Sequence, residues 1–168
     1  MNTVARLLDP FDARAGVDGV FHPPYIALHL GAAERLGRRR LLVVKGGGGE
    51  AERNAAKPMA AHLFARGAGQ VELSLPAIST ARVGGASGDG ADLLRVWQGD
   101  GDAEAETAVV KATIALGLLA LGAVDTGAAA DAQAADIWVR RHADLDAASR
   151  ASFCGAAEPA ARPRIRFA

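Results

Sequence analysis

A short apolar run that ends in four consecutive glycines constrains the fold of this chain more than any other feature. The run Leu41–Val44 contains only leucine and valine, which is typical of a buried strand. In open α/β sheets, ligands bind beyond the carboxyl ends of the strands, and glycines let backbone N–H groups approach an anion closely. The sequence therefore predicts an anion-binding, cofactor-type site at Lys45, Gly46, Gly47, Gly48 and Gly49.

Two carboxylates follow these glycines. Glu50 and Glu52 offer the hard oxygen ligands that Mg²⁺ prefers, and such a cation can be held against a phosphate. The residues leave a second interpretation open, in which the segment is a flexible surface loop with solvated acids. No catalytic residue is predicted, because no serine lies in a G-x-S-x-G motif and no other side chain is a convincing general base.

The length of 168 residues indicates one α/β domain, which we expect to span residues 1–155. Half of the residues are hydrophobic, which is enough to bury a core. Residues 156–168 are rich in alanine, proline and arginine, and we expect a disordered tail there.

Charge and cysteine content exclude several classes of protein. Nineteen basic and nineteen acidic residues give no net charge, so nothing global attracts the chain to nucleic acid or to an anionic membrane. The single cysteine, Cys154, excludes an intrachain disulfide framework. The longest nearly apolar stretch, Thr107–Val124, contains Lys111 and is too short to span a bilayer. We therefore expect a cytoplasmic protein without a membrane segment.

A strand, a helix and a second strand are predicted near the N-terminus. The first strand is Val17–Phe21, and the helix begins at Pro23 or Pro24 and runs to about Leu36. The second strand is Leu41–Val44. Strands joined by a helical crossover are parallel, so the sequence predicts an α/β fold with a parallel-sheet core and flanking helices.

The remaining elements are predicted less sharply, from periodicity and from turn residues. Thr3–Leu8, near the N-terminus, is the end of a helix, and strands are expected over Met59–Phe64 and Gln70–Leu75. A loop follows over residues 84–102, with a short element around Leu93–Trp97. Two helices are expected over Ala103–Leu121 and Gly127–His142, and the second has Asp125 or Thr126 as its N-cap.

Basic and histidine side chains leave alternatives open. Arg38–Arg40 form either a solvated corner or, together with Arg162, Arg164 and Arg166, a phosphate-binding surface. His22 is either a ligand contact or a structural residue at a turn, because no other histidine or cysteine lies at metal-ligand spacing. His29 and His62 are expected to be packing or surface residues.

Three segments in order carry a resemblance to a known family. They are Asn2–Pro10, Gly19–Tyr25, and Leu42–Gly46 with the glycines and acids that follow. At this spacing the chain resembles glycosyltransferase family 3, the anthranilate phosphoribosyltransferase-like proteins, and most closely their tryptophan-synthesis-like paralogues. The resemblance is good from residue 2 to about 64, fair at residues 103–142 and absent in the tail.

The resemblance implies the C-terminal α/β domain of phosphoribosyltransferases of the nucleoside phosphorylase and anthranilate phosphoribosyltransferase type. Such proteins transfer a phosphoribosyl group from phosphoribosyl pyrophosphate to an amine, with Mg²⁺. The family's Gly-Thr-Gly-Gly-Asp pyrophosphate loop does not occur in these 168 residues. Lys45 replaces the family's histidine, and Ala51 splits its adjacent acids. The resemblance thus implies a C-terminal portion that is inactive alone.

Partners follow from the same resemblance. The chain is expected to form a homodimer or to need a missing N-terminal chain, because uncovered apolar surface on Ala103–Leu121 or near Leu7 and Leu8 would favour association. The alternative is a non-catalytic paralogue that binds nucleic acid.

Overall fold

The computed structural model describes residues 7–9, 11–80, 96–99 and 103–154, and the side chains of these as far as residue 141. The chain divides into two compact units, Met1–Ala135 and Asp136–Ala168. The first unit holds the sheet and the residues predicted to bind an anion and a metal, which lie between 45 and 52. Whether residues 1–155 behave as one domain stays a prediction.

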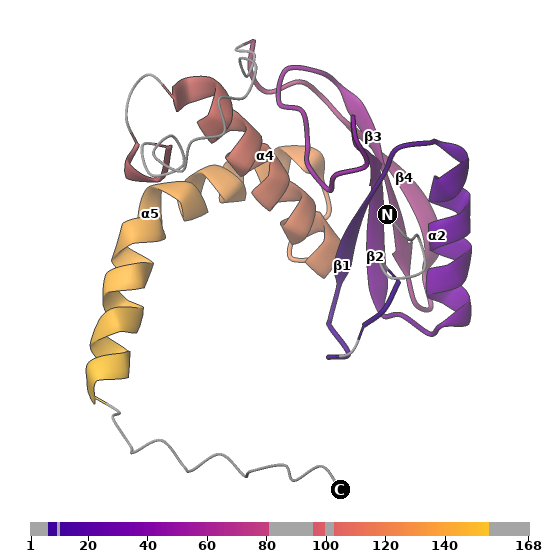
Figure 1. Cartoon of the computed structure of the whole chain (residues 1–168), viewed down its shortest axis with the longest axis horizontal. Helices are drawn as coiled ribbons and strands as arrows, with labels where there is room; N and C mark the ends of the chain where they lie inside the picture. Colours follow the sequence, from indigo (N-terminus) through magenta and orange to yellow (C-terminus); the bar gives the residue numbers. More distant parts are fainter. Residues whose placement is uncertain (1–6, 10, 81–95, 100–102, 155–168) are drawn as a thin grey trace, which may run out of the picture. The chain divides into compact units, whose positions relative to one another are not determined.

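Four strands form one sheet in the order β1 (Gly16–Val20), β2 (Arg40–Lys45), β3 (Met59–Ala65) and β4 (Gly69–Leu75) (Figure 1). Strands β1 and β2 are parallel, and helix α2 (Pro24–Arg35) connects them. This arrangement confirms the predicted strand–helix–strand unit. As expected, Pro24 stands at the start of α2, and Gly37, with φ of 68°, follows its end.

The prediction of a parallel-sheet core is wrong for the rest of the sheet. Strand β3 runs antiparallel to β2, and β4 antiparallel to β3. A parallel connection needs a crossover of about a dozen residues or more, usually a helix. The turn between Ala65 and Gly69 is far too short for that, and the segment from β2 to β3 contains no helix. The sheet is therefore mixed and mostly antiparallel.

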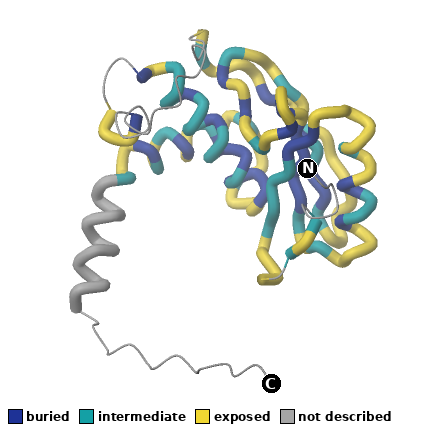
Figure 2. The backbone as a smooth tube through the Cα atoms, in the orientation of Figure 1, coloured by how far each residue is buried: buried dark blue, intermediate teal, exposed yellow. Residues whose placement is uncertain are grey.

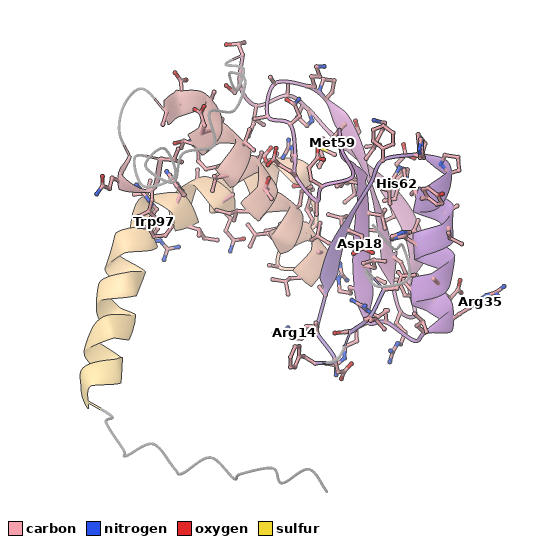
Figure 3. The ribbon with its side chains drawn as sticks, in the orientation of Figure 1. Arg14, Asp18, Arg35, Met59, His62 and Trp97 are labelled. Atoms are coloured by element: carbon pink, nitrogen blue, oxygen red, sulfur yellow. The ribbon has the colours of Figure 1, made fainter. Side chains whose placement is uncertain are left out.

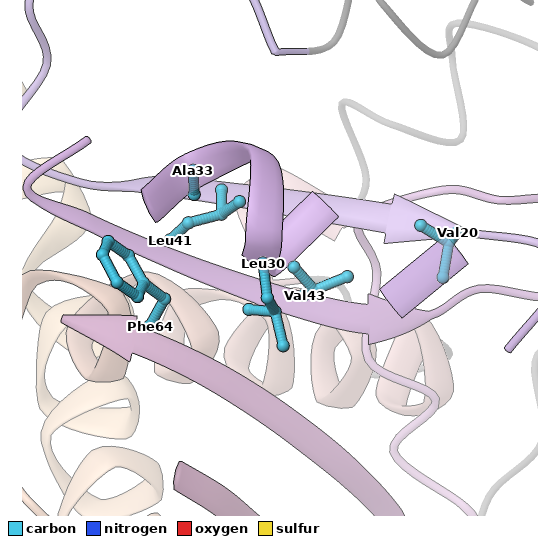
Figure 4. Close-up of a cluster of buried hydrophobic side chains, with 6 residues drawn as sticks. All are labelled: Val20, Leu30, Ala33, Leu41, Val43 and Phe64. Carbon is cyan, nitrogen blue, oxygen red and sulfur yellow. The ribbon is translucent and has the colours of Figure 1, made fainter. Parts of the chain in front are cut away.

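Strand β2 is the centre of the core, buried on both faces (Figure 2). Leu41, Leu42, Val43 and Val44 are each at most 1% exposed, which confirms the predicted buried strand. On one face, α2 contributes to a cluster of side chains: Val20, Leu30, Ala33, Leu41, Val43 and Phe64 (Figure 4). Side chains alternate along a strand, so Leu42 and Val44 lie on the other face. Helix α4 (Glu104–Leu121) packs against β1 and β2.

Both C-terminal helices begin or end at predicted residues. Helix α4 ends at Gly122, which has φ of 69°. Helix α5 (Gly127–Cys154) begins after Thr126, whose hydroxyl accepts the Ala129 N–H at 3.2 Å. Helix α5 continues well past the predicted end at His142, since no glycine or proline occurs until after Cys154.

Several predictions fall on residues outside the described ranges. These are most of the helix over Thr3–Leu8, most of the loop over 84–102 and the tail 156–168; Val96–Gln98 of the predicted short element is helical. Within the described ranges, every helix is too short or too polar to cross a lipid bilayer.

Candidate functional site

The segment from Gly46 to Arg53, called the glycine loop below, begins at the carboxyl ends of the two parallel strands. The Gly46 N–H donates to the Val20 carbonyl oxygen at 3.0 Å, so the loop continues directly from the β1–β2 pairing. The Glu50 carbonyl oxygen lies 1.9 Å from where a Cβ on Gly19 would stand, and 2.3 Å from where one on Gly46 would stand. Only glycine fits at these two positions, because the chain approaches itself there.

The loop's backbone donors already hold an anion, which belongs to the chain itself. The Gly47 N–H donates to Glu50 Oε1 at 2.6 Å, and the Gly48 N–H donates to Oε2 at 2.6 Å. The pKa of the Glu50 carboxyl is lowered, chiefly because the Glu50 backbone N–H bonds to it; the Gly48 and Gly47 bonds and the charge of Lys45 add to this, while burial opposes it. The backbone N–H groups that the sequence predicts to bind an anion therefore bind a carboxylate of the same chain.

Glu52, the second predicted metal ligand, is exposed on the same loop. Among the described residues, no three His, Cys, Asp or Glu side chains converge as metal ligands. Each carboxylate oxygen of Glu50 accepts one backbone N–H from the glycines and has capacity for a further ligand. Glu50 and Glu52 are thus suited to hold Mg²⁺ only with further oxygens from a phosphate, and metal binding stays a prediction.

Lys45 lies at the exposed end of β2, beside a group of aromatic rings. Its Nζ is 5.9 Å from the centroid of the Phe21 ring, and Phe21 meets His22 edge to face with centroids 4.5 Å apart. His22 also lies 6.0 Å from the Tyr25 ring, and its carbonyl oxygen accepts the Tyr25 N–H at 3.0 Å. His22 therefore sits in the turn that leads into α2, with its side chain among exposed rings.

The two other histidines discussed above form contacts within the fold. His29 is buried, and its Nδ1 lies 2.9 Å from Oδ2 of Asp18 on β1. His62 lies on β3 (Figure 3), and its Nδ1 is 3.5 Å from Oε2 of Glu72 on the neighbouring strand β4. His29 is thus the packing residue that was expected, and His62 a partly exposed sheet residue.

Arg53, which sequence reasoning missed, fixes the far end of the loop. Its side chain is fully buried, with Nη1 2.5 Å from Asp131 Oδ1 on α5, and its Nη2 donates to the Pro76 carbonyl oxygen at 2.8 Å. The Arg53 backbone N–H donates to the Thr113 hydroxyl on α4 at 3.2 Å. Asp131 is 78 residues from Arg53 in sequence, so no local motif predicts this ion pair.

The three arginines Arg38–Arg40 do not form one patch. Arg38 pairs with Asp9 at 3.3 Å, Arg39 pairs with Asp12, and Arg40 Nε donates to the Ala120 carbonyl oxygen at the end of α4 at 2.6 Å. Arg38 is 11% exposed, so the interpretation as a solvated corner is wrong for it. The other three arginines of the predicted surface, in the tail, lie outside the described residues. Nucleic-acid binding stays a prediction.

Exposed apolar side chains occur in the N-terminal segment, where association was predicted. Leu8 is 69% and Phe11 91% exposed. Helix α4 is largely covered, and Leu121 is its one large apolar side chain that is exposed. Of the two surfaces predicted to favour association, the segment near Leu8 is therefore the better candidate.

Comparison with known proteins gives structural likenesses but no match to a family model or to a curated sequence. The structure is similar to the crystal structure of anthranilate phosphoribosyltransferase from Thermus thermophilus, with a TM-score of 0.59 and 27% sequence identity. The match covers 86% of this chain and 46% of that chain, so this chain spans less than half of that protein's length. The likeness supports the predicted phosphoribosyltransferase-like fold.

Proposed function

We propose that this chain supplies one wall of a phosphoribosyl pyrophosphate site in a phosphoribosyltransferase-like protein. The observation that carries the proposal is the likeness to anthranilate phosphoribosyltransferase over 86% of the chain. It is supported by the position of Lys45 and the glycine loop, which follow the carboxyl ends of the parallel strands β1 and β2, where ligands of α/β folds bind.

The residues of this wall act by electrostatics. Lys45 is exposed and carries a positive charge directly beside the loop, and the Gly47 and Gly48 N–H groups are donors suited to a phosphate oxygen. Glu50 and Glu52 are the acids that would contribute to holding Mg²⁺, which when bound neutralises phosphate charge. None of these residues acts as a general base in this proposal.

We further propose that the 168 residues do not transfer phosphoribose without additional chain. Phosphoribosyl transfer requires two substrates to be oriented and water to be excluded, which needs groups on both sides of a cleft. The described residues supply one side. The other side would come from a second copy of this chain or from a partner with the missing pyrophosphate loop.

Calorimetric titration with phosphoribosyl pyrophosphate and Mg²⁺ tests the proposal. We expect weak binding to the wild type and about tenfold weaker binding to the Glu52→Gln variant, because an anionic ligand of the cation is lost while the Glu50 contact with the glycine amides is kept. Glu34→Gln, which removes an exposed acid on α2, is the control and is expected to bind like the wild type. Equal binding by all three proteins, or none by the wild type, would contradict the proposal.

Turnover is measured in the same preparation with anthranilate as a trial acceptor. We expect no consumption of phosphoribosyl pyrophosphate above the level of the Glu52→Gln variant. Clear turnover by the wild type would show that these 168 residues form a complete site.

A further inference from the structure

We infer that Glu50 is a built-in competitor for the phosphate position of the glycine loop, so that its carboxylate must leave before a phosphate binds to the Gly47 and Gly48 amides. This inference rests on the proposed function, because it concerns the same loop. The inference adds a regulatory contact to that function. Without a ligand, the Glu50 carboxylate occupies the anion position at the Gly47 and Gly48 amides, and Glu50 is also one of the two residues predicted to hold the cation.

The geometry matches a bound anion closely. The two N–H groups donate to the two different oxygens of one carboxylate, each at 2.6 Å, which is in the short range of charge-assisted hydrogen bonds. A phosphate presents oxygens in a similar way to two neighbouring backbone donors. Both ligands need the same two donors, and each N–H group makes one such strong bond, so the two cannot be bound fully at once.

The Glu50 side chain is able to leave while its backbone stays in place. The backbone is fixed because its carbonyl oxygen packs against Gly19 and Gly46, and because the Gly46 N–H is bonded to Val20. The residue is nevertheless exposed, so its carboxylate can rotate into water without opening the core. The donors therefore remain in position when the carboxylate has gone.

Lys45 favours whichever anion occupies the loop. It is the exposed last residue of β2, directly before the loop, and its charge contributes to the lowered pKa of the Glu50 carboxyl. The same charge is available to a phosphate after the carboxylate has left. Release of Glu50 also frees its oxygens for a cation, so binding of phosphate and binding of a divalent cation are expected to favour one another.

The expected gain in anion affinity depends on the fraction of molecules in which the Glu50 carboxylate occupies the loop. The apparent dissociation constant is the intrinsic constant divided by the fraction of molecules whose site is open. If two charge-assisted bonds keep the loop closed about nine-tenths of the time, removal of the carboxylate strengthens anion binding about tenfold. Loss of a nearby charge without release of the donors should give a gain of no more than a few-fold.

The test uses ¹⁵N-labelled protein and inorganic pyrophosphate, with a chelator present to exclude metal. The Gly47 and Gly48 amide signals are followed during titration of the wild type, Glu50→Ala and Glu52→Ala. We expect both signals to shift saturably in Glu50→Ala, with an affinity at least about tenfold higher than in the wild type. Glu52→Ala removes the same charge from the same loop and should gain no more than a few-fold. Glu50→Gln, which keeps the side-chain volume, serves if the alanine variant fails to fold and should also bind more tightly than the wild type.

Equal affinity of the Glu50 variants and the wild type would overturn the inference, as would an equal gain in Glu52→Ala or the absence of any response at Gly47 and Gly48. The two proposals fail separately. If Glu50→Ala gains pyrophosphate affinity but the wild type does not bind phosphoribosyl pyrophosphate with Mg²⁺, the competition is supported and the proposed function is lost. If that substrate binds but the variant gains nothing, the competition alone is lost.

Discussion

Glu50 and Arg53 lie three residues apart in one loop and make opposite kinds of ionic contact. Glu50 is exposed, and its carboxylate bonds to N–H groups two and three residues before it. Arg53 is fully buried, and its guanidinium reaches an aspartate 78 residues ahead. The first contact can open in water at small cost, whereas opening the second leaves a charge in the core.

The difference shows how one loop combines a side chain that can exchange its contacts with an end that is fixed to the fold. The Arg53 end is tied to α4 through Thr113 and to α5 through Asp131, so it locates the loop on the fold. The Glu50 carboxylate accepts bonds only from nearby N–H groups of the loop, so its side chain can exchange with a ligand. A site that must bind and release needs such a fixed end and such an exchangeable end. The predictions below test this division.

The largest effect is expected for Asp131→Ala. Removing the partner of a fully buried guanidinium should lower the free energy of unfolding by about 3–5 kcal/mol, since Arg53 is left charged and uncompensated in the core. Urea denaturation measures the change. The control is Asp12→Asn, which removes the charge that pairs with Arg39, where the side chains are 75% and 50% exposed, and which tolerates the φ of 48° at this residue; the expected loss there is about 0–1 kcal/mol. Similar losses in the two variants would contradict the assignment of Arg53 as the anchor.

A smaller loss is expected for Gly19→Ala. The new Cβ would lie 1.9 Å from the Glu50 carbonyl oxygen, and backbone must move to relieve the overlap. A loss of about 1–3 kcal/mol is typical of such overpacking. Gly31→Ala is the matched control, because its Cβ would meet nothing within 4 Å and lies within helix α2; it should be neutral or slightly stabilising. If thermal melts rank the two variants in the other order, the close approach of the loop to β1 is wrong.

Glu50→Gln should change stability little. The residue is exposed and its contact is local, so a loss of no more than about 1.4 kcal/mol is expected for the free energy of unfolding, which is the contribution of a contact closed about nine-tenths of the time. The variant is compared with Glu52→Gln by urea denaturation. A loss as large as that of Asp131→Ala would show that the Glu50 contact is a structural anchor and would remove the distinction between the two ends of the loop.

The smallest effect concerns acid pH. The pKa of the Glu50 carboxyl is lowered in the folded state, so the carboxylate contact stabilises the fold above the ordinary glutamate pKa, and this contribution is lost as pH falls through the lowered value. An NMR titration of the Glu50 side chain should give a midpoint below the ordinary glutamate pKa. A midpoint at or above the ordinary glutamate pKa would indicate that the carboxylate does not bind the glycine N–H groups.

Local signals in the sequence were enough to predict most of the elements. The run Leu41–Val44, Pro24 at the start of α2, and Gly122 after α4 each determine structure within a few residues, and the structure agrees with them. Strand direction beyond β2 was predicted wrongly, because it depends on whether a connection is long enough to cross over. The short turn between Ala65 and Gly69 allows only an antiparallel pair.

The site was predicted only as far as local rules reach. Glycines before an acid indicated anion-binding donors, and Gly47 and Gly48 do hold a carboxylate. That the carboxylate belongs to Glu50 depends on how tightly the loop folds, which periodicity and composition do not report. Arg53 gave no signal, because its burial depends on α4 and α5 and on an aspartate far along the chain.

The cap that Arg40 places on helix α4 has a consequence for folding kinetics. Arg40 Nε and the Ala120 carbonyl oxygen belong to residues 80 positions apart. The hairpin β3–β4, in contrast, closes through a short turn. Closure of a long loop costs chain entropy before its contacts form, so the hairpin is expected to form early and α4 to dock late. Substitution of Arg40 should then accelerate unfolding and leave the refolding rate nearly unchanged, which stopped-flow measurements would show.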